Sequence, residues 1–368
     1  MKIIRKTKKL IKTPGLFFRD YFNQRYPLMH TELRMSEDKE VAILLGEQSS
    51  RVFSRNDSPV DVVYTWVDNS DPAWQDKYQF HKAMYESQGI DLGSFATDNA
   101  RFENHHELYY SIKSVQKNMP WIRHIYVVTD GQTPAWINEF NNITMVFHHQ
   151  IIDAQYLPTF NSHVIEAFLH KIPNLSENFL YFNDDVFVAK PLQKSHFFAA
   201  NDIASLFVSA KKLADMQNKG LKTSTLSACI RVKSLLERHF SVSIDHALVH
   251  TYYPLKKSAY EQAWKIFGEQ ILTFLPNKFR TNHDLNMATF LVPWLMYCQK
   301  QSVEGIDVCY YFNIRSRTAL TCYAKLLGQQ DENLLPHSFC ANDFHAKNSK
   351  QIADYKEQLV NFLQKYYK

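Results

Sequence analysis

Apolar runs alternate with segments of helical periodicity between residues 59 and 190, and this alternation constrains the fold more than any other feature of the sequence. Apolar residues recur at helical spacing in 103–118 and 162–171. The apolar runs occupy residues 59–68, 122–130, 143–149 and 179–188. Strands that alternate with helices predict an α/β fold with a mostly parallel sheet.

Polar residues stand where the predicted strands end. The first two runs end in Asp68 and Asp130, and the third contains His148 near its end. The fourth, which begins at Phe179, runs into Asn183-Asp184-Asp185. Ligands of open parallel sheets bind outside the carboxyl ends of the strands. We therefore expect these side chains to meet in one crevice.

Two adjacent carboxylates, Asp184 and Asp185, repel each other unless a cation or a proton neutralises them. Mg²⁺ is typically held by one or two carboxylates together with substrate phosphates. The pair thus predicts a metal–diphosphate site. A simple turn after a strand would use the same residue types, but the polar residues at the other strand ends favour the functional interpretation.

Phosphate binding here would depend on a metal and on basic side chains. The nine glycines form neither GxGxxG nor GxxxxGK[ST], which excludes a dinucleotide fingerprint and a P-loop. Lys256 and Lys257 follow His250, and Arg280 precedes Asp284. Arginine can clamp phosphate through two parallel hydrogen bonds, so these residues suit a diphosphate, although surface charge is the alternative.

The predicted helix 162–171 places His163, Glu166 and His170 on one face, at steps of three and four. A carboxylate beside an imidazole raises its pKa towards neutrality, so this face can serve as acid–base apparatus. A structural ion pair is the alternative. Residues 190–245 are poorly patterned and predict an insertion that covers the sheet.

The first 25 residues carry eight basic and one acidic side chain, a net charge of +7 against +5 for the whole chain. Residues 1–27 therefore predict a basic amphipathic segment on a membrane surface; a solvated helix or a nucleic-acid patch is the alternative. Residues 28–58 are expected to be a connector and 59–368 the catalytic domain. Five cysteines without a CxxC pair indicate reduced thiols in a cytosolic protein, and no run is long enough to span a membrane.

Four separated blocks of the sequence form a recognisable set. They are Asp61–Asp68; a second block from Arg101 through Trp121–Gln132 and Leu157–His163 to Phe182–Asp185; His250 with Arg280 and Asp284; and Cys340–Asp343. Through these blocks the chain resembles the stealth family of hexose-1-phosphate transferases, which includes bacterial capsule polymerases and, more distantly, the lysosomal-enzyme N-acetylglucosamine-1-phosphotransferase. The sequence departs from the family at His106 and Phe344, where the family usually has Asp.

The resemblance implies a nucleotide-sugar transferase core of the GT-A type, with helical C-terminal additions and Mg²⁺, or Mn²⁺, at the Asn-Asp-Asp cluster. It also places His250 and Arg280 in the catalytic site. With the motifs above, it predicts three sets of site residues. The metal ligands are Asp184, Asp185 and Asn342; the catalytic residues are Asp184, His250, Arg280, His163 and Glu166; the substrate-binding residues are Asp61, Thr65, Trp66, Asp68, Arg101, Asn161, Lys256 and Lys257.

The expected activity is transfer of a sugar 1-phosphate, with N-acetylglucosamine 1-phosphate as the best guess, from a UDP-sugar to a hydroxyl of a growing glycan, releasing UMP. The expected partners are the UDP-sugar, an oligosaccharide or polysaccharide acceptor, an anionic membrane and other capsule-assembly proteins, but no nucleic acid. The expected location is the cytoplasmic face of the inner membrane. The alternatives are a glycosyltransferase that releases UDP and a non-catalytic glycan-binding or scaffold subunit. The acidic cluster counts against a scaffold, because a binding module does not need a cation there.

Overall fold

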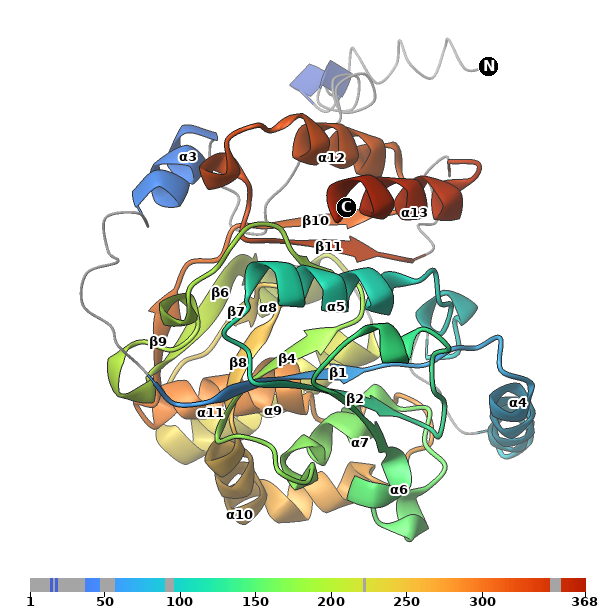
Figure 1. The fold of residues 1–368 in the computed structure, drawn as a ribbon. Helices are drawn as coiled ribbons and strands as arrows, with labels where there is room; N and C mark the ends of the chain where they lie inside the picture. The colour runs from blue at the N-terminus through green and yellow to red at the C-terminus, as the bar shows by residue number, and fades with distance from the viewer. Residues whose placement is uncertain are drawn as a thin grey trace.

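The structure is a computed structural model that describes residues 14–15, 17–18, 37–46, 57–89, 96–220, 223–344 and 352–368 (Figure 1). Most of the predicted membrane-surface segment 1–27, and much of the connector 28–58, lie outside the described residues. From residue 57 onward the chain folds into an α/β body around one central sheet.

The central sheet has five strands in the order β3-β2-β1-β4-β8. The first four along the chain run parallel to one another, and β8 pairs antiparallel with β4. Their bounds are β1 Val60–Thr65, β2 His124–Thr129, β3 Ile143–Phe147, β4 Asn178–Asn183 and β8 Tyr253–Lys256. The predicted α/β fold with a mostly parallel sheet is thereby confirmed.

Helices cover both faces of this sheet, which explains why its strands are continuous apolar runs. In β1, Val62, Val63 and Tyr64 are all completely buried. Figure 1 shows α5 above the sheet and α7, α9, α10 and α11 below it. These helices span Glu107–Asn118 (α5), Ser162–Ala167 (α7), Ser224–Phe240 (α9), Lys257–Phe274 (α10) and Val292–Cys298 (α11).

The strand order reverses beside β1, since β2 and β3 lie on one side of it and β4 on the other. Parallel connections that leave β1 in opposite directions open a crevice at its carboxyl end, where open α/β sheets bind their ligands. The carboxyl ends of β1 and β4 are in register, with Thr65 paired to Asn183. Trp66 and Asp184 therefore follow at the same edge.

Two smaller sheets extend the body. One has the order β10-β11-β5, with β5 Val186–Val188, β10 Cys309–Asn313 and β11 Ser338–Asn342. The other has the order β7-β6-β9, with β6 Ala204–Lys212, β7 His246–Leu248 and β9 Ser302–Gly305. The C-terminal helices α12 (Arg317–Gly328) and α13 (Tyr355–Tyr366) share a hydrophobic cluster with the first of these sheets.

Residues 190–245, expected to be an insertion, contain β6, α8 (Leu213–Asn218) and α9. Leu206, Val232 and Leu236 from this segment belong to the main hydrophobic core. The segment is therefore built into the body rather than laid over it.

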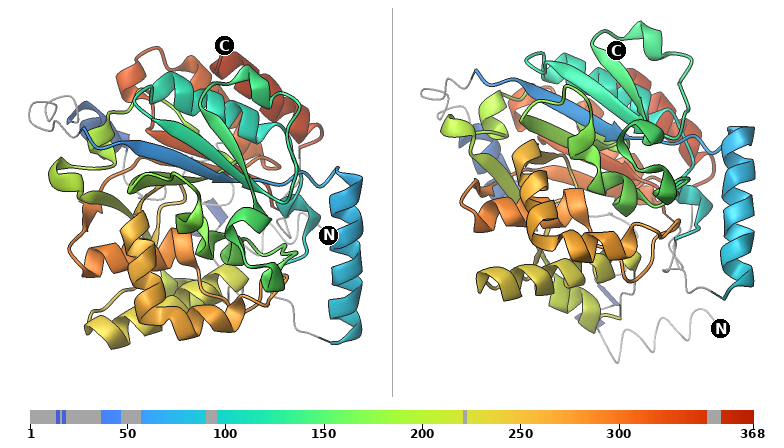
Figure 2. Two further views of the ribbon diagram at one scale, coloured as in Figure 1. Left: turned by 60° about the horizontal axis from the view of Figure 1, so that its bottom comes forward. Right: turned by 90° about the horizontal axis from the view of Figure 1, so that it is seen from below.

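The remaining helices are α3 (Glu37–Gly46), α4 (Pro72–Ser87) and α6 (His148–Ile151). Helix α4 stands at the margin of the body in both views of Figure 2. It is anchored by an aromatic cluster in which Trp74 and Tyr78 pack against Phe160. Trp74 also lines the cavity described below.

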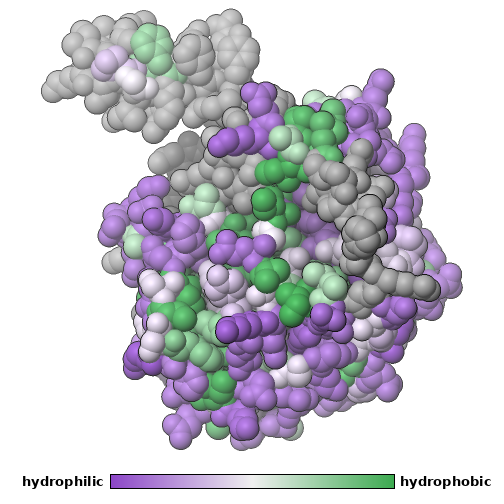
Figure 3. Space-filling view, turned by 90° about the vertical axis from the view of Figure 1, so that its left-hand side faces the viewer, coloured by the Kyte–Doolittle hydropathy of each residue, from purple (hydrophilic) through white to green (hydrophobic). Residues whose placement is uncertain are grey.

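Within the described residues, no helix is both long and apolar enough to cross a membrane. Figure 3 shows one face of the molecule, on which hydrophilic residues dominate and apolar residues gather towards the middle. Val303 in β9 and Ile306 just after it are among the exposed apolar side chains of the chain, at 52% and 49% exposure.

Candidate active site

A cavity of about 390 Å³ opens at the carboxyl ends of β1 and β4. Its walls come from segments far apart in the sequence. They include Thr65, Trp66, Arg101, Glu107, Asp130, His148, Asn183, Asp184, Asp185, Thr225, His250, Arg280, Asn342 and Asp343. The predicted crevice therefore exists, and Asp130, His148 and the Asn183–Asp185 cluster share it.

Three carboxylates crowd one side of this cavity. Burial and the neighbouring charge of Asp185 raise the pKa of Asp184 to about 7. Burial and the charge of Asp184 likewise raise the pKa of Glu107 well above its ordinary value. A cation beside these groups would remove the electrostatic cost of ionising them together.

Asp185 is held by residues from β11. The amide Nδ2 of Asn342 donates to its Oδ2 at 2.8 Å, and the thiol of Cys340 donates to the same oxygen at 3.3 Å. Ligating atoms of Asp185, His250 and Cys340 lie within 4.8 Å of one another. Antiparallel pairing of β11 with β5, the strand that follows Asp185, brings these side chains together.

Asp184, Asp185 and the side-chain carbonyl of Asn342 are the oxygen donors that a hard divalent cation requires. The residues present thus fit Mg²⁺ or Mn²⁺. In two further clusters of histidine and carboxylate side chains, other protein residues already bind the carboxylate. In one, Arg315 and His105 bind Asp343, and in the other, His196 and Ser338 bind Asp307.

Two arginines line the same cavity, Arg101 and Arg280. Burial and the charge of Arg280 lower the pKa of Arg101 well below its ordinary value. The guanidinium of Arg280 donates from Nη1 to Thr225 at 3.1 Å and from Nε and Nη2 to the hydroxyl of Ser162. Among the residues that the structure describes, neither guanidinium forms an ion pair with a carboxylate. The two positive charges are therefore available to an anion.

His163 and Glu166 lie behind the cavity rather than on it. His163 is 1% exposed and its Nδ1 donates to Asp284 at 3.1 Å. Glu166 accepts from the backbone N–H of Ala288 at 3.3 Å and is buried close to Arg280. The predicted three-residue face is not formed, because α7 ends at Ala167 and the His170 ring stacks on Tyr260.

Three predicted substrate-binding residues are not brought to the cavity. Asp61 lies at the amino end of β1, completely buried, and accepts hydrogen bonds from Arg123 and from the backbone N–H of Ser176. Lys256 pairs with Asn178 at the amino end of β4, and Lys257 begins α10. Because β8 runs antiparallel to β4, both lysines lie at the end of the sheet opposite Asp184. The expectation that they sit beside the diphosphate is corrected accordingly.

Two other predicted residues frame the cavity from outside. Asp68 follows Trp66 and Val67, both of which line the cavity, and it accepts a 2.9 Å bond from Asn104. Asn161 caps α7 and donates to the backbone oxygen of Phe279 at 3.1 Å, next to Arg280.

Sequence reasoning missed Glu107, Ser162 and Thr225. Glu107 begins α5 beside His106, the position at which the sequence departs from the stealth pattern. Thr225 lies in the segment that was expected to be an insertion, so no pattern pointed to its contact with Arg280.

The amino-acid sequence of this chain matches that of a known protein family. Residues 58–85 match the model of Stealth protein conserved region 1, and residues 101–206 match that of conserved region 2. The chain is 53% identical to a capsular polysaccharide phosphotransferase of Actinobacillus suis, over 100% of this chain and 99% of that protein. The chain belongs to the Stealth family. It is therefore an enzyme of the transferase class.

A second relative of this Stealth protein is the capsular polysaccharide phosphotransferase LcbA of Neisseria meningitidis, 51% identical over 99% of this chain and 100% of that protein. Among solved structures, a galactosyltransferase LgtC in complex with donor and acceptor sugar analogues is similar with a TM-score of 0.39 and 11% identity. That likeness covers 83% of this chain and 95% of the other.

Proposed function

We propose that this Stealth protein transfers a sugar 1-phosphate, with N-acetylglucosamine 1-phosphate as the first candidate, from a UDP-sugar to a hydroxyl group of a growing capsular glycan. The products are UMP and a glycan phosphodiester. The names of relatives that are 53% and 51% identical over nearly the whole chain support the capsular phosphotransferase assignment.

The observation that carries the proposal is that Arg101 and Arg280 line the same cavity as Asp184 and Asp185. Phosphoryl transfer spreads negative charge over the oxygens of the migrating group, and its catalysis is mostly positioning and electrostatic stabilisation. Two guanidiniums that form no ion pair with a carboxylate of the described residues are suited to that charge. Attack at a sugar carbon would need less positive charge around the phosphate.

The acidic side of the cavity would hold the cation. Asp184, Asp185 and Asn342 would be the ligands of Mg²⁺, or of Mn²⁺ in its place. When bound there, the cation would supply positive charge to the diphosphate oxygens. The nucleotide part of the donor would bind to Arg101 and to three residues at the carboxyl end of β1, which are Thr65, Trp66 and Asp68.

His250 is the residue that we assign to take the proton of the acceptor hydroxyl. It lines the cavity, whereas the other histidine considered, His163, does not. His250 also lies within 4.8 Å of Asp185, which would bring the acceptor hydroxyl next to the diphosphate. Glu166, buried beside Arg280, is assigned an electrostatic role on that arginine.

At the amino end, residues 1–27 would bind the anionic cytoplasmic surface of the inner membrane, and so bring the enzyme to other capsule-assembly proteins and to the acceptor. The proposal rests on the net charge of +7 in the first 25 residues.

The deciding experiment incubates the enzyme with a panel of UDP-sugars, Mg²⁺ and short glycan primers, and resolves the nucleotides by chromatography. UMP that appears only with primer supports the proposal. UDP as the primer-dependent product would mean an ordinary glycosyltransferase.

A further inference from the structure

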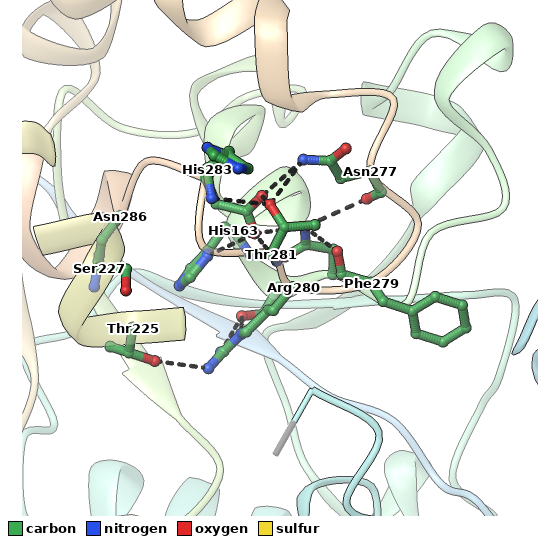
Figure 4. Close-up of polar contacts among 12 residues, drawn as sticks. His163, Thr225, Ser227, Asn277, Phe279, Arg280, Thr281, His283 and Asn286 are labelled. Atoms are coloured by element: carbon green, nitrogen blue, oxygen red, sulfur yellow. Dashed lines mark hydrogen bonds and ion pairs between the residues drawn. The ribbon is translucent and has the colours of Figure 1, made fainter. Parts of the chain in front are cut away.

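The loop that carries Arg280 is folded around one buried carboxylate, that of Asp284. Figure 4 shows Arg280 with Asn277 and Thr281 of the same loop and with His163 beside them. Asp284 is completely buried, yet it accepts five hydrogen bonds. Two come from the hydroxyl and the backbone N–H of Thr281, at 2.8 and 3.1 Å. A third comes from Nδ2 of Asn277, at 2.9 Å. The turn 277–284 is thus closed on itself by its own last residue.

The remaining two bonds join this loop to the start of helix α7. Nδ2 of Asn161 donates to Asp284 at 2.9 Å, and Nδ1 of His163 donates at 3.1 Å. Ser162, which lies between them, accepts hydrogen bonds from the guanidinium of Arg280. The loop that carries the arginine and the helix start that receives it are therefore tied together through Asp284.

His163 is built to donate to this carboxylate and not to exchange protons with a substrate. Burial and the positive charge of Arg280 lower the pKa of His163 to about 4, so the imidazole is neutral. Its Nε2 is buried and has no hydrogen-bond partner among the described residues. Although burial alone would raise it, hydrogen bonds from His163, Asn277 and Asn161 keep the pKa of Asp284 below its ordinary value.

We propose that Asp284, held by His163 and Asn161, is the positioning residue of Arg280. It holds Asn277 and Thr281, one on each side of the arginine, and so aligns Arg280 with Ser162. Five donors already occupy the carboxylate, and no ion pair joins it to Arg280, so the guanidinium charge stays available to the phosphoryl group. The inference rests on the proposed function only in that Arg280 acts on the transferred group.

A double-mutant cycle tests this inference. Asp284→Asn should lower kcat on the order of 100-fold with little change in KM for the donor. The reason is that a misplaced Arg280 stabilises the transition state less, while binding of the donor in the ground state changes little. In an Arg280→Ala background, the same Asp284→Asn substitution should cause almost no further loss. An equal loss in both backgrounds would show that Asp284 acts independently of Arg280 and would overturn the proposal.

Asp307→Asn is the matched control. Asp307 is also completely buried and accepts from Nε2 of His196 at 3.0 Å and from Ser338 at 2.9 Å, but it does not line the cavity. Asp307→Asn should change kcat by the same factor in the parent enzyme and in the Arg280→Ala variant. If Asp284→Asn does not fold, Thr281→Val replaces it, because this substitution removes one donor to Asp284. Thr281→Val should lower kcat by a smaller factor, and this loss of kcat should also vanish in the Arg280→Ala background. If the loss of kcat persists in that background, the proposal is overturned.

One choice separates this test from the test of the proposed function. Turnover is measured as total primer-dependent nucleotide release, so the coupling is defined whether UMP or UDP appears. Additive effects on this turnover would refute the positioning role, even when UMP is the product.

Discussion

The side-chain amide of Asn342 donates a 2.8 Å hydrogen bond to Asp185, from a position 157 residues further along the chain. This bond joins the end of β11 to the turn between β4 and β5. The orientation of one proposed metal ligand is therefore set by another. The acidic cluster is a product of tertiary pairing and not of the Asn-Asp-Asp sequence alone.

Substitution of Asp184 should affect activity and stability in opposite directions. Asp184→Asn should lower turnover on the order of 1000-fold, because the proposed cation loses a ligand. At pH 8 without metal, the same variant should be more stable than the parent by on the order of 1 kcal/mol or more, because burial and Asp185 disfavour the charged carboxylate. Urea denaturation in EDTA measures the second effect, and full activity of the parent in EDTA would refute the metal assignment.

Three buried histidines should destabilise this protein in acid. Burial lowers the pKa of His148, His163 and His170 to about 4, against an ordinary value of 6.5. Each contributes stability that is present above pH 6.5 and is lost as the pH falls towards 4, because the unfolded chain binds a proton that the folded chain does not. Between these values, the three histidines together contribute up to about 4 kcal/mol per pH unit to the fall in the free energy of unfolding. The raised pKa values of Asp184 and Glu107 contribute a slope of opposite sign.

Urea titrations at a series of pH values measure this slope. His170→Gln removes one of these three protons without touching the cavity, so the contribution to the slope should fall by up to about 1.4 kcal/mol per pH unit in this variant. A slope equal to that of the parent would mean that His170 titrates normally in the folded protein.

Lys256 and Lys257 should be dispensable for catalysis, since they lie at the end of the sheet opposite Asp184. Alanine at either position should change kcat/KM by no more than about twofold. Asp61→Asn should lower the melting temperature, because Asp61 is buried and paired with Arg123, but should leave KM for the donor unchanged. A large rise in KM for the donor on substitution of Lys256, Lys257 or Asp61 would show that the residue binds the substrate.

Local patterns in the sequence predict the strands, whereas long-range pairing decides where several site residues lie. The four parallel strands are predictable because each is buried on both faces, so apolar runs mark them directly. Their carboxyl ends share one edge of the sheet, and this made the meeting of Asp130 and Asp184 predictable as well. The positions of Lys256 and Lys257 were not predictable, because nothing in a short run such as β8 reveals that it pairs antiparallel with β4.

The candidate site shows the same division. The paired carboxylates and Arg280 could be found from residue type and family resemblance. The contacts that hold Arg280 could not, since Ser162 and Thr225 are ordinary polar residues separated from it by 118 and 55 positions. His170 was assigned to the face of His163 because helical spacing says nothing of where a helix ends.

Removal of residues 1–25 should release the protein from anionic membranes and spare catalysis on soluble primers. Each basic residue near an anionic surface contributes roughly 1 kcal/mol, so seven net charges are ample for binding. Sedimentation with vesicles that contain phosphatidylserine, at moderate salt, compares the truncated and full-length chains. Continued sedimentation of the truncated chain would place the membrane-binding surface elsewhere.

An isotope experiment determines which bond of the donor breaks. In the proposed reaction the acceptor hydroxyl attacks the β-phosphorus, so the bond between the anomeric carbon and its oxygen stays intact. A UDP-sugar labelled with ¹⁸O at that bridging oxygen should therefore deliver the label to the glycan, with the anomeric configuration of the donor retained. Mass spectrometry of the product and phosphorus NMR of the new diester measure both. Recovery of the label in released UDP would show attack at the anomeric carbon, and Arg101 and Arg280 would then act as binders of the leaving group.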